Sequence, residues 1–209
     1  VNLGRRPVVV VGYKGNLVRN QVRERADHVW QQNQFGTGHA LACTQEHLNN
    51  FVGSILVLYG DHPLISHKTI ENLFELHHSE RSVLTMMTTE VEDFDDWRQT
   101  FYNFGRILRN GDNSIQAIRE MKDCLENEKQ VKELNPGYYC FNSDWLWQNI
   151  DKIKNENKQQ EYYLTDLVEM AVQQNKTINS IKIHPIECLG INTPDHLELV
   201  EKLIRERTS

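Results

Sequence analysis

The 209-residue chain is predicted to be an α/β protein, with a mostly parallel, Rossmann-like mixed sheet, flanking helices and one small antiparallel lobe. Two observations support this class. Short apolar runs rich in β-branched residues alternate with stretches of helical pattern, which is typical of strands buried between helices. The alternation is interrupted once, where two strand-like runs flank the turn sequence 110–113 and predict a hairpin.

Each element follows from its local pattern. Strands are predicted where apolar runs are short and bounded by turn residues: 7–13, 28–30, 55–58, 82–88, 104–109, 114–120, 134–141, 177–184 and 187–191. Helices are predicted where the period lengthens or a capping residue opens the segment: 16–25, 37–48, 67–77, the segment capped by Ser143, 165–174 and 194–206. Loops are expected where the chain is acidic, charged or polar: 90–103, 124–133 and 152–160.

The run 55–58 is the most informative strand, because four apolar residues between glycines predict a buried central strand of a parallel sheet. It ends in Tyr59-Gly60-Asp61, which places one carboxylate at the carboxyl edge, where open α/β sheets bind ligands. Gly60 permits close approach of a ligand, and Asp61 is a natural oxygen ligand for Mg²⁺. The alternative is that Asp61 caps the helix that starts near Ser66.

Composition limits the possible functions. The net charge of −6 and the pI near 5.9 argue against a nucleic-acid-binding surface, and no apolar run approaches the roughly 18 residues of a membrane span. The four cysteines form no C-x-x-C pair, which favours a reducing cytosol over disulfides or a zinc site. The nine histidines form no metal-binding pattern, and we expect them at the surface.

A Gly-rich turn, Gly36-Thr37-Gly38, leads into a helix. Backbone N–H groups at such a position can hold an anionic or planar polar group, and Gln31, at the preceding strand end, adds an amide suited to the edge of a nucleobase. Asn192 follows another predicted strand and would meet Asp61 at the same edge to complete a Mg²⁺ site. An ordinary turn and an N-cap for the last helix are the respective alternatives.

The middle of the chain contributes residues suited to a sugar. A carboxylate would come from Glu120 and an amide from Asn135, with Gly105 in the same part of the chain. Thr165 stands at the start of a predicted helix. Glu120 could equally pair with a neighbouring Arg119 or Lys122 on a solvated face, and Thr165 could be a plain helix cap.

Taken in order, the segments Q-x-x-x-x-GTGHA, LYGD-x-PLI, FGRI, I-x-E-x-KD, E-x-N-x-G, EYYLTD and G-x-N resemble the N-terminal uridylyltransferase domain of bacterial N-acetylglucosamine-1-phosphate uridyltransferases. The resemblance covers about residues 7–203. It implies the nucleotide-diphospho-sugar transferase fold in one domain, 1–209. Within this domain, residues 1–103 would bind the nucleotide, residues 104–186 would form the sugar-binding lobe and helices, and residues 187–209 would return to the core.

The resemblance also implies roles for individual residues. Gln31 matches the residue that contacts uracil, Gly36 and Thr37 contact the nucleoside, and Tyr59 and Gly60 line the pocket. Asp61 and Asn192 match the ligands of the Mg²⁺ cofactor. The residues around the N-acetylglucosamine moiety are matched by Gly105, Glu120, Asn135 and Thr165.

Two departures from the family pattern stand out. Pro136 replaces the small residue usual between Asn135 and Gly137. The family's loop L-A-A-G-x-G-S/T-R-M and its Pro-Lys pair, which hold the triphosphate, would precede Val1, so we expect these 209 residues alone to be weak or inactive.

The reaction implied by the resemblance takes UTP and N-acetylglucosamine 1-phosphate to UDP-N-acetylglucosamine and pyrophosphate, in the cytoplasm and for envelope polymers such as peptidoglycan. The substrates would be small molecules, with no nucleic acid or membrane partner, and an oligomer is possible. Three alternatives stay open: a non-catalytic nucleotide-sugar-binding module, a nucleotidyltransferase for another sugar 1-phosphate, and a metal-dependent glycosyltransferase. The last would usually need a second carboxylate close to Asp61.

Overall fold

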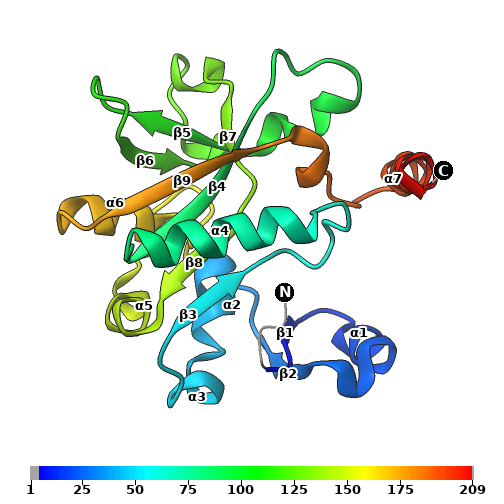
Figure 1. Ribbon diagram of the computed structural model, residues 1–209, viewed down its shortest axis with the longest axis horizontal. Coiled ribbons are helices and arrows are strands. Elements are labelled where there is room, and N and C mark those ends of the chain that lie inside the picture. The colour runs from blue at the N-terminus through cyan, green and yellow to red at the C-terminus, as the bar shows by residue number, and fades with distance from the viewer. Residues whose placement is uncertain (1–4, 209) are drawn as a thin grey trace.

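The computed structural model describes residues 5–208, and within them strands and helices form two sheets with helices packed around them (Figure 1). The strands are β1 (Val8–Val11), β2 (Asp27–Trp30), β3 (Ser54–Val57), β4 (Leu84–Glu90), β5 (Gly105–Arg109), β6 (Ile115–Arg119), β7 (Glu133–Asn135), β8 (Tyr139–Asn142) and β9 (Ile178–Ile183). The α-helices are α1 (Gly15–Val22), α2 (Thr37–Ala42), α3 (Gln45–Leu48), α4 (His67–Ser79), α5 (Ser143–Asn149), α6 (Asp166–Gln173) and α7 (Pro194–Thr208). Short 3₁₀ segments lie at Arg23–Arg25, Asp96–Asn103, Met121–Asp123, Glu128–Gln130, Ile150–Lys152 and Pro185–Cys188.

The pairing of the strands confirms the mixed α/β class but corrects the expectation of a mostly parallel sheet. β1 and β2 form a small parallel sheet of their own. The seven-stranded sheet has the order β3-β8-β4-β7-β5-β6, with β9 added parallel to β4. Every other pair in it is antiparallel. The predicted hairpin, β5–β6, is present and belongs to this sheet, because β7 connects it to β4.

The strand before Asp61 is not the buried central strand that the sequence predicts. Among the described residues, β3 pairs only with β8 and forms the edge of the large sheet. Ile55 is buried, whereas Leu56 and Val57 are only partly covered. A continuous apolar run therefore does not by itself distinguish a central strand from an edge strand that is covered on both faces.

Several element boundaries also differ from expectation. Pro136 and Gly137 divide the predicted strand 134–141 into β7 and β8, since proline cannot donate to a ladder. The predicted strand 187–191 is absent from the described residues, and a 3₁₀ turn occupies part of it. The predicted helix 37–48 is two short helices, and the acidic segment 96–103 is a 3₁₀ helix and not an irregular loop. Asn142, not Ser143, caps α5 by accepting from the Trp145 N–H at 3.0 Å.

The hydrophobic core lies on both faces of the large sheet. One face is covered by α2, α5 and α6, with Met86 pointing into it. The other is covered by α4, the 96–103 helix and α7, with Met87 pointing into it. Two histidines are part of the interior, contrary to the expectation that all are exposed: His62 is 9% exposed and His77 is 4% exposed.

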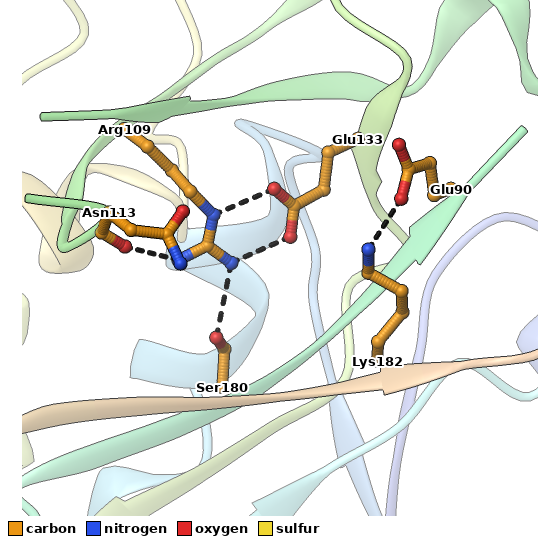
Figure 2. Close-up of polar contacts among 6 residues, drawn as sticks. All are labelled: Glu90, Arg109, Asn113, Glu133, Ser180 and Lys182. Atoms are coloured by element: carbon orange, nitrogen blue, oxygen red, sulfur yellow. Dashed lines mark hydrogen bonds and ion pairs between the residues drawn. The ribbon is translucent and has the colours of Figure 1, made fainter. Parts of the chain in front are cut away.

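Polar contacts connect the hairpin to the centre of the sheet (Figure 2). Arg109 on β5 makes a bidentate ion pair with Glu133 on β7, at 2.7 and 2.6 Å, and also donates to Ser180 on β9. Lys182 pairs with Glu90 beside it. These contacts fix β5, and with it Gly105, relative to strands β7 and β9.

Within the described part of the chain, no helix has the length and apolar character needed to cross a bilayer.

Candidate active site

The Gly-rich turn is held directly against the segment 161–166, although more than 120 residues separate the two. The Gly38 N–H donates to the Tyr162 carbonyl at 2.8 Å, and the Tyr162 N–H donates to the Phe35 carbonyl at 2.7 Å. The Thr37 hydroxyl accepts from the Leu164 N–H at 3.1 Å. A Cβ at Gly36 would lie 2.7 Å from the Tyr162 carbonyl oxygen, so a glycine is required for this contact.

These contacts change the expected role of the turn. The Gly38 N–H is already bonded to protein, so a cradle of free N–H groups over the whole turn is not what the structure contains. Gln31 stabilises the same turn, because its Nε2 lies 3.0 Å from the Gly36 carbonyl and 2.9 Å from His39 Nδ1. Gln31 therefore presents its amide oxygen, not its N–H₂ group, as the group suited to a ligand.

The residues predicted to surround a sugar are brought together. Thr165 donates to the Glu120 carboxylate at 3.0 Å and makes no side-chain cap to α6. Gly105 faces Asn135 across the β5–β7 pair, and a Cβ on Gly105 would lie 3.5 Å from the same Glu120 oxygen. Neither the solvated-face alternative for Glu120 nor the cap alternative for Thr165 matches these contacts.

Burial tunes the carboxylate at this place. Desolvation raises the pKa of Glu120 above its usual value, the Thr165 hydrogen bond opposes that shift, and the charges of Asp123 and Glu161 add to it. Asp166, next to Thr165, has its pKa raised to about 6 by burial and by the charges of nearby carboxylates. The region is thus rich in negative potential and in hydrogen-bond acceptors, which suits the hydroxyl groups of a sugar.

Tyr59 connects this region to Asp61. Gly137, at φ +84°, packs under the Tyr59 ring. The side-chain oxygen of Asn135, Oδ1, accepts a hydrogen bond from the Gly137 N–H at 3.1 Å. Desolvation raises the pKa of Tyr59 to about 12, and the charges of Glu120 and Asp61 add to the shift. Tyr59 is nevertheless 38% exposed, so one part of its ring faces solvent.

Asp61 and Asn192 lie on adjoining segments of the chain. The Ile191 N–H donates to the Asp61 carbonyl at 2.9 Å, and the Asp61 side chain is 44% exposed. Asp61 does not cap α4, because Ser66 does so, accepting from the Thr69 N–H at 3.0 Å. Thr193, not Asn192, caps the last helix by accepting from the His196 N–H at 3.2 Å.

The chemistry of these two residues fits Mg²⁺, which prefers carboxylate and amide oxygens together with water and phosphate. Among residues 5–208 no group of three or more His, Cys, Asp or Glu side chains is placed to hold a metal. Mg²⁺ usually keeps several waters and binds through one or two carboxylates plus substrate phosphates, so one carboxylate and one amide would leave its remaining positions to water and substrate oxygens.

His62 and Tyr138 belong to this site and were missed from the sequence. His62 Nδ1 lies 2.7 Å from the Tyr138 hydroxyl, and His62 Nε2 lies 4.0 Å from the Asp61 carboxylate. Burial lowers the pKa of His62, and the charge of Asp61 only partly offsets this. The direct adjacency of His62 to Asp61 was the only signal in the sequence.

A separate hollow lies away from these residues. It has a volume of about 780 Å³ and is lined by residues of β2 and α1 and their neighbours, including Arg6, Arg19 and Arg23. None of the predicted site residues lines it. The connected contacts around Asp61 and Glu120, and not this hollow, therefore define the candidate site.

The comparison with known protein families identifies the class to which this fold belongs. The profile of the nucleotidyl transferase family matches residues 8–184, and the chain belongs to this family. Among curated relatives, it is 38% identical over 203 residues to the bifunctional protein GlmU of Acetivibrio thermocellus, covering 96% of this chain and 42% of that protein. It is 36% identical over 204 residues to the bifunctional protein GlmU of Geotalea daltonii, covering 95% of this chain and 43% of that protein.

The chain thus spans less than half the length of these relatives. Solved structures share its fold at low identity. A UDP-glucose pyrophosphorylase complexed with UDP-glucose has a TM-score of 0.62 and 16% identity, covering 84% of this chain and 73% of that one. A nucleoside-diphosphate-sugar pyrophosphorylase from Vibrio cholerae RC9 has a TM-score of 0.64 and 15% identity, and the match covers 91% of this chain and 78% of that one.

Proposed function

We propose that this chain is the nucleotide-sugar-forming part of an N-acetylglucosamine-1-phosphate uridylyltransferase, which converts UTP and N-acetylglucosamine 1-phosphate to UDP-N-acetylglucosamine and pyrophosphate. One observation carries the proposal beyond family membership. The motif segments, scattered over some 160 residues of sequence, are brought into one neighbourhood by hydrogen bonds, strand pairing and close packing between the Gly-rich turn, the Glu120 region and Tyr59. The Ile191 N–H, next to Asn192 in the chain, bonds to the Asp61 carbonyl. The bifunctional GlmU proteins, 38% and 36% identical to this chain, support the family membership on which the proposal rests.

In this reaction an oxygen of the sugar phosphate attacks the α-phosphorus of UTP, a new P–O bond forms, and pyrophosphate leaves with the electrons of the broken bond. Phosphoryl and nucleotidyl transfers depend mainly on positioning and charge neutralisation. Gln31, through its amide oxygen, would accept from the uracil N3–H, and Gly36 and Thr37 would contact the nucleoside. Tyr59 and Gly60 would line the space between the nucleoside and Asp61.

The sugar would be held by the Glu120 region. The Glu120 carboxylate would accept from a sugar hydroxyl, and the Asn135 amide would meet the N-acetyl group. Gly105 leaves space beside Glu120, and Thr165 orients the carboxylate. A carboxylate that is already desolvated loses little when a sugar covers it, which favours binding.

Asp61 and Asn192 would hold Mg²⁺ as the cofactor, and the ion would supply charge neutralisation at the phosphates. A nucleotide sugar of this kind would be made in the cytoplasm, as a precursor for peptidoglycan and other envelope polymers. The division into a nucleotide part, residues 1–103, a sugar lobe, 104–186, and a return segment, 187–209, belongs to the same proposal. Residues 1–4 and 209 of these ranges lie outside the described residues.

Calorimetric titration with UDP-N-acetylglucosamine, with and without Mg²⁺, tests the proposal on the chain as it is. Saturable binding is expected, and Gln31→Ala and Asn135→Ala should each weaken it by about tenfold, the loss of one hydrogen bond to a buried partner. Gln116→Ala, at an exposed position on β6, is the matched control and should bind normally.

UDP-glucose, titrated in parallel, tests the sugar. Equal or tighter binding of UDP-glucose would assign the site to another sugar 1-phosphate, in keeping with the unusual Pro136. Binding of neither compound, by a protein whose circular dichroism shows a folded chain, would contradict the proposal.

A further inference from the structure

His62 is buried beside Asp61 and is held by aromatic rings on three sides. Its ring stacks parallel to Phe104, at an interplanar angle of 2° and a centroid distance of 6.4 Å. It meets Tyr138 edge-on at 5.5 Å and Tyr59 at 5.4 Å. The imidazole therefore has a fixed position immediately behind the exposed Asp61 carboxylate.

The hydrogen bonds around the ring fix its tautomer. The Tyr138 hydroxyl lies 2.9 Å from the Glu187 carbonyl oxygen and 2.7 Å from His62 Nδ1. A carbonyl can only accept, so the single Tyr138 proton is donated to Glu187. The Tyr138 oxygen must then accept from His62, and the His62 proton is on Nδ1. Nε2 consequently carries a lone pair.

That lone pair is on the side of the ring where Asp61 and the Asn192 segment meet. Nε2 is 4.0 Å from an Asp61 carboxylate oxygen. A Cβ on Gly190 would lie 2.9 Å from His62 Nε2 and 3.4 Å from the other Asp61 oxygen. Because Gly190 has no side chain, its backbone can pack directly against His62 and Asp61. An imidazole fixed by a hydrogen bond from its second nitrogen is the usual form of a metal-ligating histidine.

We propose that His62 Nε2 is a nitrogen ligand for the divalent cation held by Asp61 and Asn192, and that it shifts the preference of this site from Mg²⁺ toward Mn²⁺. The inference rests on the Asp61–Asn192 pair of the proposed function. Ligands at about 2.1 Å from one octahedral ion lie about 3 Å apart when adjacent and about 4 Å apart when opposite. The 4.0 Å separation lies within that range, and the exposed Asp61 carboxylate is free to adjust. Imidazole suits transition metals, whereas Mg²⁺ prefers oxygen ligands alone.

Electron paramagnetic resonance with Mn²⁺ alone as the probe tests the proposal without any turnover. Mn²⁺ bound to the wild-type protein should show ¹⁴N coupling of imidazole in pulsed experiments, and the coupling should be lost in His62→Val. Competition between Mg²⁺ and Mn²⁺ should show that His62→Val lowers the preference for Mn²⁺ by about tenfold. Tyr138→Phe keeps the His62 ligand but removes the hydrogen bond that holds the proton on Nδ1. This variant should weaken Mn²⁺ binding by a smaller factor than His62→Val does.

His196→Gln is the control, because His196 Nδ1 lies 3.3 Å from the Asn192 N–H and offers the other imidazole near the site. This variant should retain the ¹⁴N coupling. Bound Mn²⁺ that shows no ¹⁴N coupling, or coupling that is lost in His196→Gln and not in His62→Val, would overturn the role of His62. Binding that is insensitive to Asp61→Asn would instead contradict the Asp61–Asn192 site on which the inference rests, while UDP-N-acetylglucosamine titration still tests the proposed function separately.

Discussion

Gly137→Ala should damage the candidate site through a single added methyl group. Gly137 has φ +84°, in the region where a side chain costs about 1–2 kcal/mol. Its Cβ would lie 1.9 Å from Cε2 of Tyr59, so the ring must also move. Overpacking typically costs about 1–3 kcal/mol, and Tyr59 is 38% exposed and can swing outward, so we take the lower end. The expected loss in the free energy of unfolding is about 2–3 kcal/mol, or about 4–12 °C in Tm.

The displaced ring gives the prediction a second, functional readout. Tyr59 lies between the Glu120 and Asp61 regions, so its movement should weaken UDP-N-acetylglucosamine binding by more than about tenfold in calorimetry at a temperature where the variant is folded. Gly111→Ala is the control, because its Cβ would meet nothing within 4 Å and its backbone is not in the strained region. Wild-type Tm and binding in Gly137→Ala would refute the packing argument.

Two further predictions concern charges. The pKa of Asp166 is raised from 3.8 to about 6, so the native state loses stability as pH rises through that interval; Asp166→Asn should remove the penalty. After discounting for partial exposure and for the lost helix-dipole interaction, we expect about 1 kcal/mol more stability at pH 7 and little change at pH 4, measured by urea denaturation. Burial alone would raise the pKa of Glu133, but hydrogen bonds from Arg109 lower that pKa below 4.5. The ion pair therefore stabilises the protein fully above pH 4.5, and this stabilisation is lost as the pH falls through the lowered pKa of Glu133. Glu133→Gln should therefore cost about 2 kcal/mol at pH 7 and clearly less at pH 4, and a loss that is independent of pH would show that shape, not charge, holds the hairpin.

The fold class was predictable from the alternation of patterns, whereas strand pairing was not. A four-residue apolar run such as 55–58 contains no information about its neighbours, and its partner in the structure, β8, lies about 80 residues later. The hairpin β5–β6 was predictable because its turn residues are local. The predicted strand 187–191 was wrong because buried apolar residues occur in compact turns as well as in strands.

The sequence named the positions of the candidate site but not the bonds within it. The family resemblance pointed to Glu120 and Thr165, yet the hydrogen bond between them required the fold. His62 was missed because it occupies the variable position of LYGD-x-PLI, and Tyr138 because it lies just outside E-x-N-x-G. Their significance follows only from the Glu187 carbonyl, which determines the direction of the hydrogen bonds between them.

The contacts of the Gly-rich turn explain why its sequence is restricted. A loop that only cradled a ligand would need small residues facing that ligand. Here the positions that would carry Cβ atoms at Gly36 and Gly38 face the Tyr162 carbonyl, at 2.7 and 2.9 Å, and Thr37 accepts from the protein backbone. The two segments therefore act as one structural unit, in which the 161–166 segment contacts the Gly-rich turn and, through Thr165, also Glu120, so it touches both the proposed nucleoside side and the proposed sugar side of the site. A change in either segment should consequently alter binding at both ends of a nucleotide sugar, because the backbone contacts leave no way to move one without the other.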